Sequence, residues 1–253
     1  MNSKSKKYLS IISIIVGILI WQLLALIPDI GVFLASPPET VRAFMNQVRK
    51  GSMFIDIGYS LFRVLGGFTI GLVVAIPVAF LMGWYPKFSG VVEPWIQFFR
   101  TIPPIALIPL VIVALGVGES AKIVVIFLAS FLVMVVTIYQ GVKSVDVTLI
   151  KAARVLGAKD KDIFFKVIVP ASTPFILVGV RLGLAASLTT LVAAELTGAQ
   201  VGLGEMIQSA SLYLKMDVVI LGIVIIGIIG FTLDKIVLFL ERKLTGWQET
   251  RQM

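Results

Sequence analysis

The sequence predicts an all-α integral membrane protein with six transmembrane helices. Of its 253 residues, 58% are hydrophobic and only 14% are charged, and the mean hydropathy is +1.02. Soluble proteins carry about 25% charged residues. No polar block is long enough to fold separately, so we expect a single membrane domain over residues 1–253.

The sequence also contains a series of apolar runs that reach the roughly 20 residues needed to cross a bilayer core. These runs are residues 8–27, 60–83, 93–115, 121–140, 173–196 and 218–240. The first follows three lysines, as the apolar part of a signal peptide would. It is too long for a typical signal core, and Pro28 and Asp29 offer no small-residue cleavage site. We expect it to be a retained span.

A helix on the membrane surface is predicted between the first two spans. Ser36 is followed by two prolines and Glu39, which is a helix-start signal because proline fits the first turn and a carboxylate meets the helix dipole. One apolar face follows at helical spacing, and an amphipathic helix of this kind lies at the membrane interface. Its members are Val41, Phe44, Met45 and Val48.

The third span contains helix breakers and charges at membrane depth. They are Glu93, Pro94, Arg100, Pro103, Pro104 and Pro109. Broken backbone is tolerated there only where protein or a water-filled cavity surrounds it. Two interpretations remain open: a kinked packing helix, or a helix that lines a pathway through the bundle.

Small residues form a stripe along the fifth span, and a shorter one in the second. A small residue every fourth position lets two helices approach closely. The stripes are Gly179, Gly183, Ala186, Ser187, Thr190 and Ala194, and then Gly67 and Gly71. We expect tight helix packing at both.

Charged side chains within spans are costly and mark pathways or paired structure. The predicted spans contain Arg63, Arg100, Arg181, Glu195, Asp234 and Lys235. Arg63 and Arg100 lie near span ends, where we expect them to snorkel to the surface, and we expect the last two to be interfacial. Arg181 is expected to face the interior and influence an anion. Glu195 lies 14 residues further on, about 21 Å along a helix, so the two cannot pair within one subunit.

Residues 146–170, here called the coupling loop, form a charged island between the fourth and fifth spans. They include five Lys or Arg and three Asp, yet their apolar residues keep a helical rhythm. We expect two short amphipathic helices outside the membrane. Gly157 can close the first by taking the left-handed conformation, and Pro170 is expected to stop the second.

The coupling loop resembles the "EAA" loop of ATP-binding-cassette (ABC) importer permeases. The resemblance rests on Lys151, Ala152, Ala153, Gly157 and the Val167–Pro170 ending, and extends over nearly the whole chain. It implies the type I importer permease fold, with these residues seated in a cleft of a separate ATPase subunit. The family has glutamate where this chain has Lys151, which removes any ion pair made by that glutamate but keeps the helix–glycine–helix shape.

A second resemblance is to permeases for nitrate, sulfonates and taurine. It is carried by residues 99–110 and 34–38 and by the ending Gly246 to Glu249. It implies a small oxyanion as cargo. Arg100, Pro103, Pro104, Arg181 and Glu195 are then the candidate pathway residues. Relatives in this branch also carry bicarbonate or pyrimidine-type vitamin precursors.

The distribution of basic residues predicts the orientation. Of the 22 Lys and Arg, 13 fall in segments on the side of the N-terminus, five fall on the opposite side, and four lie within spans. Because basic residues accumulate in cytoplasmic segments, we expect both termini and the coupling loop to be cytoplasmic. The five on the outer side are Arg42, Arg49, Lys50, Lys122 and Lys215.

The residue inventory argues against an enzyme. The chain has no cysteine and no histidine, and it lacks the GxxxxGK[ST] phosphate cradle. We therefore expect no metal, no cofactor and no ATP hydrolysis on this chain. The resemblance implies two copies of an ABC ATPase subunit, a second copy of this chain and an extracytoplasmic solute-binding protein as partners. We also expect contact with membrane lipid and no binding of nucleic acid. The expected location is the cell membrane of a prokaryote.

The sequence leaves other functions open. An ion-coupled secondary transporter would need acidic residues near the midplane, and the chain has few. An integral-membrane enzyme would need convergent titratable groups. An exporter subunit, or the same class of importer carrying a vitamin precursor or bicarbonate, would share most of the features above.

Overall fold

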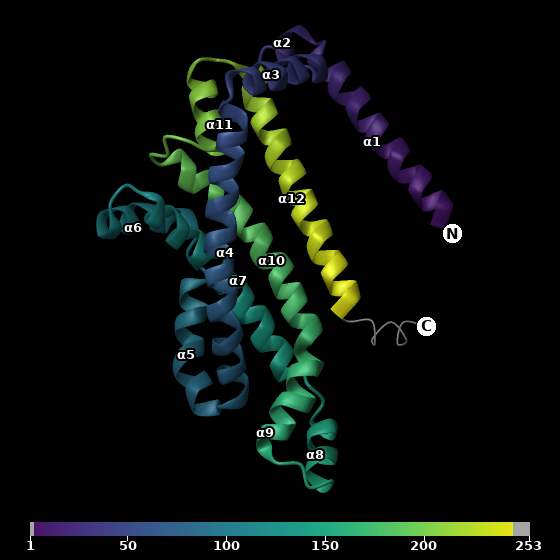
Figure 1. The fold of residues 1–253 in the computed structure, drawn as a ribbon, viewed down its shortest axis with the longest axis vertical. Coiled ribbons are helices and arrows are strands. Elements are labelled where there is room, and N and C mark those ends of the chain that lie inside the picture. The colour runs from purple at the N-terminus through teal and green to yellow at the C-terminus, as the bar shows by residue number, and fades with distance from the viewer. Residues whose placement is uncertain (1–2, 245–253) are drawn as a thin grey trace. The chain divides into compact units, whose positions relative to one another are not determined.

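A computed structural model describes residues 3–244, and this part of the chain is helical and contains no strand (Figure 1). The α-helices are α1 (Ser3–Ala25), α2 (Pro28–Gly31), α3 (Pro37–Lys50), α4 (Ser52–Trp84), α5 (Pro86–Phe99), α6 (Ile108–Leu115), α7 (Glu119–Lys143), α8 (Val147–Val155), α9 (Asp160–Ile163), α10 (Val169–Leu196), α11 (Leu203–Leu212) and α12 (Met216–Leu244). A 3-10 helix covers Pro104–Leu107 and a π-helix covers Phe164–Ile168. The predicted all-α membrane fold is confirmed.

Five helical segments among the described residues are long and apolar enough to cross a membrane. They are Tyr8–Ala25, Ser52–Trp84, Glu119–Lys143, Asp160–Leu196 and Met216–Lys243. The irregular third span is broken: α5 and the segment Pro104–Leu115 meet at 91° and make a sixth span only if counted together. The break covers residues 100–103 and is followed by Pro104; neither Pro103 nor Pro104 has a backbone N–H to continue a helix.

The contacts divide the chain into two compact units. The first contains residues 1–60 and 200–227, and the second contains residues 61–199 and 228–253. Helices α4 and α12 each contribute to both units. The single domain expected over residues 1–253 stays a prediction.

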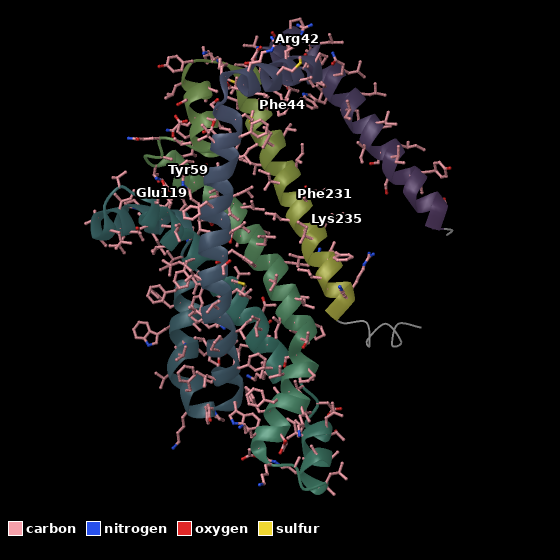
Figure 2. The ribbon with its side chains drawn as sticks, viewed as in Figure 1. Arg42, Phe44, Tyr59, Glu119, Phe231 and Lys235 are labelled. Carbon is pink, nitrogen blue, oxygen red and sulfur yellow. The ribbon has the colours of Figure 1, made fainter. Side chains whose placement is uncertain are left out.

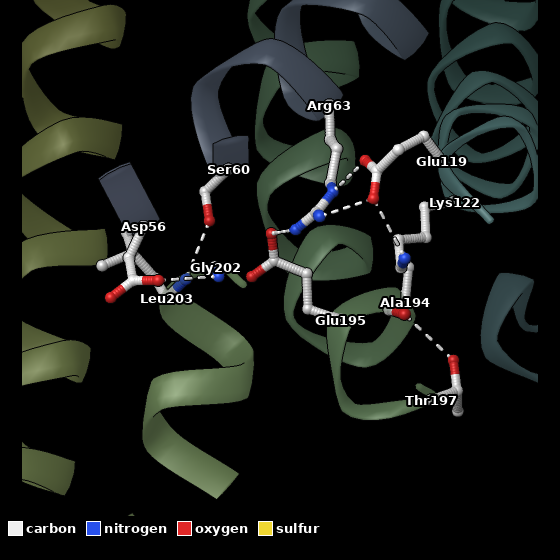
Figure 3. Close-up of polar contacts among 10 residues, drawn as sticks. All are labelled: Asp56, Ser60, Arg63, Glu119, Lys122, Ala194, Glu195, Thr197, Gly202 and Leu203. Atoms are coloured by element: carbon white, nitrogen blue, oxygen red, sulfur yellow. Dashed lines mark hydrogen bonds and ion pairs between the residues drawn. The ribbon is translucent and has the colours of Figure 1, made fainter. Parts of the chain in front are cut away.

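In the first unit, hydrogen bonds fix the helix ends. The expected helix start at Ser36 is confirmed, because Ser36 and Glu39 form a capping box at the N-terminus of α3. The short helix α11 was not predicted. Its first backbone N–H groups are bound by side chains of α4: Gly202 N–H donates to the Asp56 carboxylate at 3.0 Å, and Leu203 N–H donates to the Ser60 hydroxyl at 2.9 Å (Figure 3).

The core of the second unit is built where α4 and α10 pack on α7. A Cβ on Gly67 of α4 would lie 2.7 Å from the Ile126 side chain, and one on Gly179 of α10 would lie 3.1 Å from Ile138. Gly183 similarly meets Met134. These glycines let the backbones approach closely, so the predicted tight packing is confirmed at both stripes.

Candidate functional site

The first helix of the coupling loop is α8, which is capped by Asp146 at its N-terminus and closed by Gly157 just beyond its C-terminus. The Asp146 carboxylate accepts the backbone N–H of Thr148 at 2.8 Å. This hydrogen bond, with a further one from the Thr148 side chain, holds the pKa of Asp146 below its usual value. At the other end Gly157 has φ +80°, and Ala158 N–H donates to the Ala153 carbonyl at 3.0 Å. This is a Schellman closure, and it confirms the left-handed conformation predicted for Gly157.

The second half of the loop is anchored in the core of the second unit. Ile163 is fully buried and Ile168 is 4% exposed. The Phe164 ring makes edge-to-face contacts with Phe80 and Trp84 of α4, at centroid distances of 5.6 and 5.4 Å. The second half of the loop therefore packs directly against α4.

The prediction that Pro170 ends the second short helix is wrong. The helical path continues from Asp160 to Leu196, and Pro170 lies in the first turn of α10. A proline ring clashes with the carbonyl four residues earlier. Here the preceding turn is widened into a π-helix, in which Val169 N–H donates to the Phe164 carbonyl five residues back. The wider turn accommodates the proline without interrupting the helix.

The tip of the coupling loop is the exposed part. Val155 and Leu156 are 88% and 86% exposed, and Lys151 and Ala152 are also exposed. In Figure 1, α8 and α9 lie together beyond the ends of α7 and α10. An apolar tip on a rigidly anchored helix pair is suited to insertion into a groove on another protein.

A cavity of about 400 Å³ lies between α7, α10 and the break after α5. We call it the pathway cavity. Its wall is formed by Arg100, Ile102, Pro104, Ile105, Ala129, Leu132, Val133, Ala186, Thr189, Thr190 and Ala193. One cationic residue and two threonines lie in an otherwise apolar wall, a composition typical of small-molecule sites.

The predicted pathway residues are only partly brought together. Arg100 and Pro104 line the pathway cavity, whereas Pro103, Arg181 and Glu195 do not contribute to its wall. Arg181 is 38% exposed, and its Nε donates to the Asp234 carboxylate at 3.0 Å. The pathway roles of all five residues stay predictions.

The expectation that Arg63 snorkels to the surface is wrong. Its side chain is 1% exposed and belongs to a buried charge network with Glu119, Lys122 and Glu195 (Figure 3). Arg63 Nε and Nη2 donate to the two oxygens of Glu119 at 2.5 and 2.7 Å, and Nη1 donates to Glu195 at 2.6 Å. Because the two carboxylates neutralise the guanidinium inside the unit, it does not need to reach water.

Thr189 and the carboxylate of Glu119 were missed as site residues. Thr190 appeared only as a member of the small-residue stripe. Both threonines line the cavity because they follow Ala186, another lining residue, by about one turn of α10. Glu119 gave a weaker signal, since it precedes an apolar run and looks like an ordinary carboxylate in a first helical turn.

A family model described as binding-protein-dependent transport system inner membrane component matches residues 67–246. The match includes both the coupling loop and the pathway cavity. The chain belongs to this family. It is therefore a permease subunit of an ABC importer. Membership of this family favours that function over a secondary transporter, an enzyme or an exporter subunit.

Curated relatives agree over almost the whole length. The chain is 53% identical to a probable ABC transporter permease protein of Brucella abortus, over 95% of this chain and 96% of that protein. It is 37% identical to the taurine transport system permease protein of Escherichia coli, over 94% and 89% of the two chains. A nitrate import permease protein of Synechocystis is 31% identical over 91% and 86%.

A solved structure supports the fold. An inward-facing structure of the MetNI methionine ABC transporter matches with a TM-score of 0.65 and 21% identity. The match covers 76% of this chain and 96% of the chain in that structure. At this identity the likeness concerns the fold alone, which is that of an ABC importer permease.

Proposed function

We propose that this permease carries a small oxyanion, of the sulfonate, taurine or nitrate kind, into a prokaryotic cell. The observation that carries the proposal is the pathway cavity, whose only charged wall residue is Arg100. No carboxylate of the described residues lies within 4.0 Å of this guanidinium. A planar guanidinium matches an oxyanion because it can donate two parallel hydrogen bonds. The relatives named for taurine and nitrate support the same class.

The cargo is delivered from an extracytoplasmic binding protein and crosses between two copies of this chain. Two ATPase subunits on the cytoplasmic side grip the exposed tips of the two coupling loops. ATP-driven closure then moves the tip around Val155 and Leu156. Because Phe164 packs on Phe80 and Trp84, this movement re-orients α4 and opens the pathway to the other side.

The cargo class is tested by uptake into proteoliposomes that contain the complete complex with its own binding protein. We expect taurine or nitrate to accumulate with ATP, and Arg100→Gln to lower the rate about tenfold or more, since a charge-assisted hydrogen bond contributes about 1.5–3 kcal/mol. Lys87→Gln removes one exposed charge elsewhere and is the matched control. Unchanged uptake by the Arg100→Gln complex would exclude Arg100 from the pathway.

A neutral cargo would give a different result. If no sulfonate, taurine, nitrate or bicarbonate is accumulated, and none of them competes with the solute that is, the oxyanion class is wrong while the permease assignment stands. The comparison should therefore include bicarbonate and a pyrimidine-type compound. Uptake of the pyrimidine-type compound at a rate that Arg100→Gln does not change would overturn the proposal.

A further inference from the structure

Helix α3, the helix predicted to lie on the membrane surface, presents an apolar and a basic outward face that the transport function does not use, and we propose that together these faces bind anionic phospholipids. The helix is well defined at both ends. Ser36 N–H donates to the Glu39 carboxylate at 2.7 Å, and Gly51 closes the C-terminus with φ +78°. Its Thr40 and Ala43 are buried, which fixes one face against the first unit. The two remaining faces therefore have fixed directions.

One outward face of α3 is apolar. Val41, Phe44 and Met45 are 57%, 41% and 47% exposed, and their spacing of three and four residues places them on one side of the helix. Figure 2 shows Phe44 and Arg42 on this helix. Large apolar side chains gathered on one side of an otherwise polar helix favour contact with a lipid phase.

The connections of α3 hold this apolar face at the membrane surface. Both neighbouring long helices, α1 and α4, qualify as membrane spans, and α4 begins at Ser52, directly after Gly51. On the other side, the Trp21 Nε1–H of α1 donates to the Ala35 carbonyl at 2.9 Å. A helix tied this closely to two span ends lies in the interfacial layer, where acyl chains and headgroups meet.

The second outward face of α3 is basic and borders the apolar one. Arg42 and Arg49 are exposed and two helical turns apart, about 10.5 Å along the axis, and Lys50 follows. In the described part of the chain, none of these three has a carboxylate within 4.0 Å. Guanidinium groups pair well with phosphate. The spacing is too long for one phosphate, so each arginine binds a headgroup of its own.

Anionic headgroups also explain why the basic residues are tolerated here. In the predicted orientation, these three are among the five basic residues on the outer side, where the positive-inside rule disfavours them. Each basic residue near an anionic membrane surface raises the affinity for that surface about fivefold. This attraction offsets the disadvantage of placing these residues on the outer side.

The lipid contact can be tested at one position, because the chain contains no cysteine. Met45→Cys, spin-labelled in the complete complex in lipid nanodiscs, is expected to be more accessible to oxygen than to a water-soluble nickel chelate. Asn46→Cys is the matched control, since the next residue is exposed on a different face and should show the opposite preference. A Met45 label that is water-accessible like Asn46, or immobilised by a protein contact, overturns the proposal.

The preference for negative charge needs its own measurement. Complexes purified from vesicles of phosphatidylcholine mixed with phosphatidylglycerol are analysed for bound lipid by mass spectrometry. We expect wild type to enrich phosphatidylglycerol, and Arg42→Gln/Arg49→Gln to lower this enrichment about fivefold, because each of the two headgroup sites loses one basic residue. Arg154→Gln/Lys159→Gln, with the same loss of charge on the coupling loop, should keep the enrichment.

Salt gives a second readout that requires no substitution. Raising the ionic strength should lower the phosphatidylglycerol enrichment of wild type, because exposed charges are screened. Equal binding of the two lipids by wild type at low salt, or full enrichment by the Arg42→Gln/Arg49→Gln complex, would show that α3 does not select anionic lipid.

Discussion

At the scale of single residues, the charge network around Arg63 is the feature with the largest energetic consequence. Arg63 and Glu195 are both essentially inaccessible to solvent, at 1% and 0% exposure, whereas Glu119 is 41% exposed. The interaction with Glu195 is therefore the one made fully inside the protein. Removing Glu195 would leave the buried guanidinium of Arg63 paired with the partly exposed Glu119.

Glu195→Gln should accordingly destabilise the subunit by about 1.5–3 kcal/mol, the usual contribution of a hydrogen bond to a charged group, because Arg63 keeps its two hydrogen bonds to Glu119. The measurement is thermal unfolding of the purified complex. Arg154→Gln is the control, because its ion pair with Asp160 spans 3.6 Å between exposed side chains and contributes at most about 1 kcal/mol. Equal midpoints for Glu195→Gln and wild type would show that the buried ion pair adds nothing to stability.

The network also shows where reasoning from sequence fails. The partners of Arg63 lie 56 and 132 residues away along the chain, so nothing near Arg63 indicates that it is buried and paired. Gly157 was predicted correctly because a helix closure depends only on neighbouring residues. The lengths of the spans were predictable for the same local reason, and the 91° break was indicated by its prolines.

The residues that line the pathway cavity were predictable from the sequence only in part. Arg100 and Pro104 were recognised because charge and proline are unusual in a span. Thr189 was not, since a threonine in an apolar helix is unremarkable until the packing of α10 on α7 shows which side it faces. Pro170 was misjudged because the π-helical turn that accommodates it has no sequence signature of its own.

At the scale of elements, close helix packing in the second unit depends on particular glycines rather than on glycine in general. Gly67 and Gly66 are neighbours on α4, but only Gly67 faces α7 at short range. A Cβ on Gly67 would lie 2.7 Å from the Ile126 side chain and 2.9 Å from the Ile123 carbonyl, whereas one on Gly66 would meet only the tip of Ile123 at 3.8 Å.

Gly67→Ala should therefore destabilise the subunit by about 1–3 kcal/mol, the usual cost of overpacking. Gly66→Ala introduces the same methyl group one residue earlier and should be neutral or slightly stabilising, because alanine is the better helix former. Both are measured by thermal unfolding. A loss of stability that is equal for the two variants would contradict the packing described for α4 and α7.

The turn at Gly157 is the second element whose geometry can be tested. Its φ of +80° costs a residue with a side chain about 1–2 kcal/mol. Gly157→Val should alter the angle between α8 and α9 and lower the ratio of transport to ATP hydrolysis, while membrane insertion is unchanged. Gly58→Ala, at a helical glycine with open space around it, is the control. Wild-type coupling in Gly157→Val would show that coupling does not depend on the left-handed turn at Gly157.

At the scale of the whole molecule, the chain is a membrane permease whose energy input is expected to come from another subunit. The coupling loop is anchored in the core at one end and exposed at the other, as expected of an element that binds a partner subunit. Ile163 and Ile168 are buried in the core, and Val155 and Leu156 are exposed to 88% and 86%. The ATPase contact that this arrangement requires remains a proposal.

The most direct test of that contact is a crosslink from the tip of the loop. Because the chain has no cysteine, Leu156→Cys carries a single photoactivatable crosslinker in the complete complex. We expect it to capture the ATPase subunit, with a yield that changes when ATP is bound, while the same probe at exposed Ser120, at the start of α7, captures none. Capture at Ser120 but not at Leu156, or at neither, would contradict the coupling role of residues 146–170.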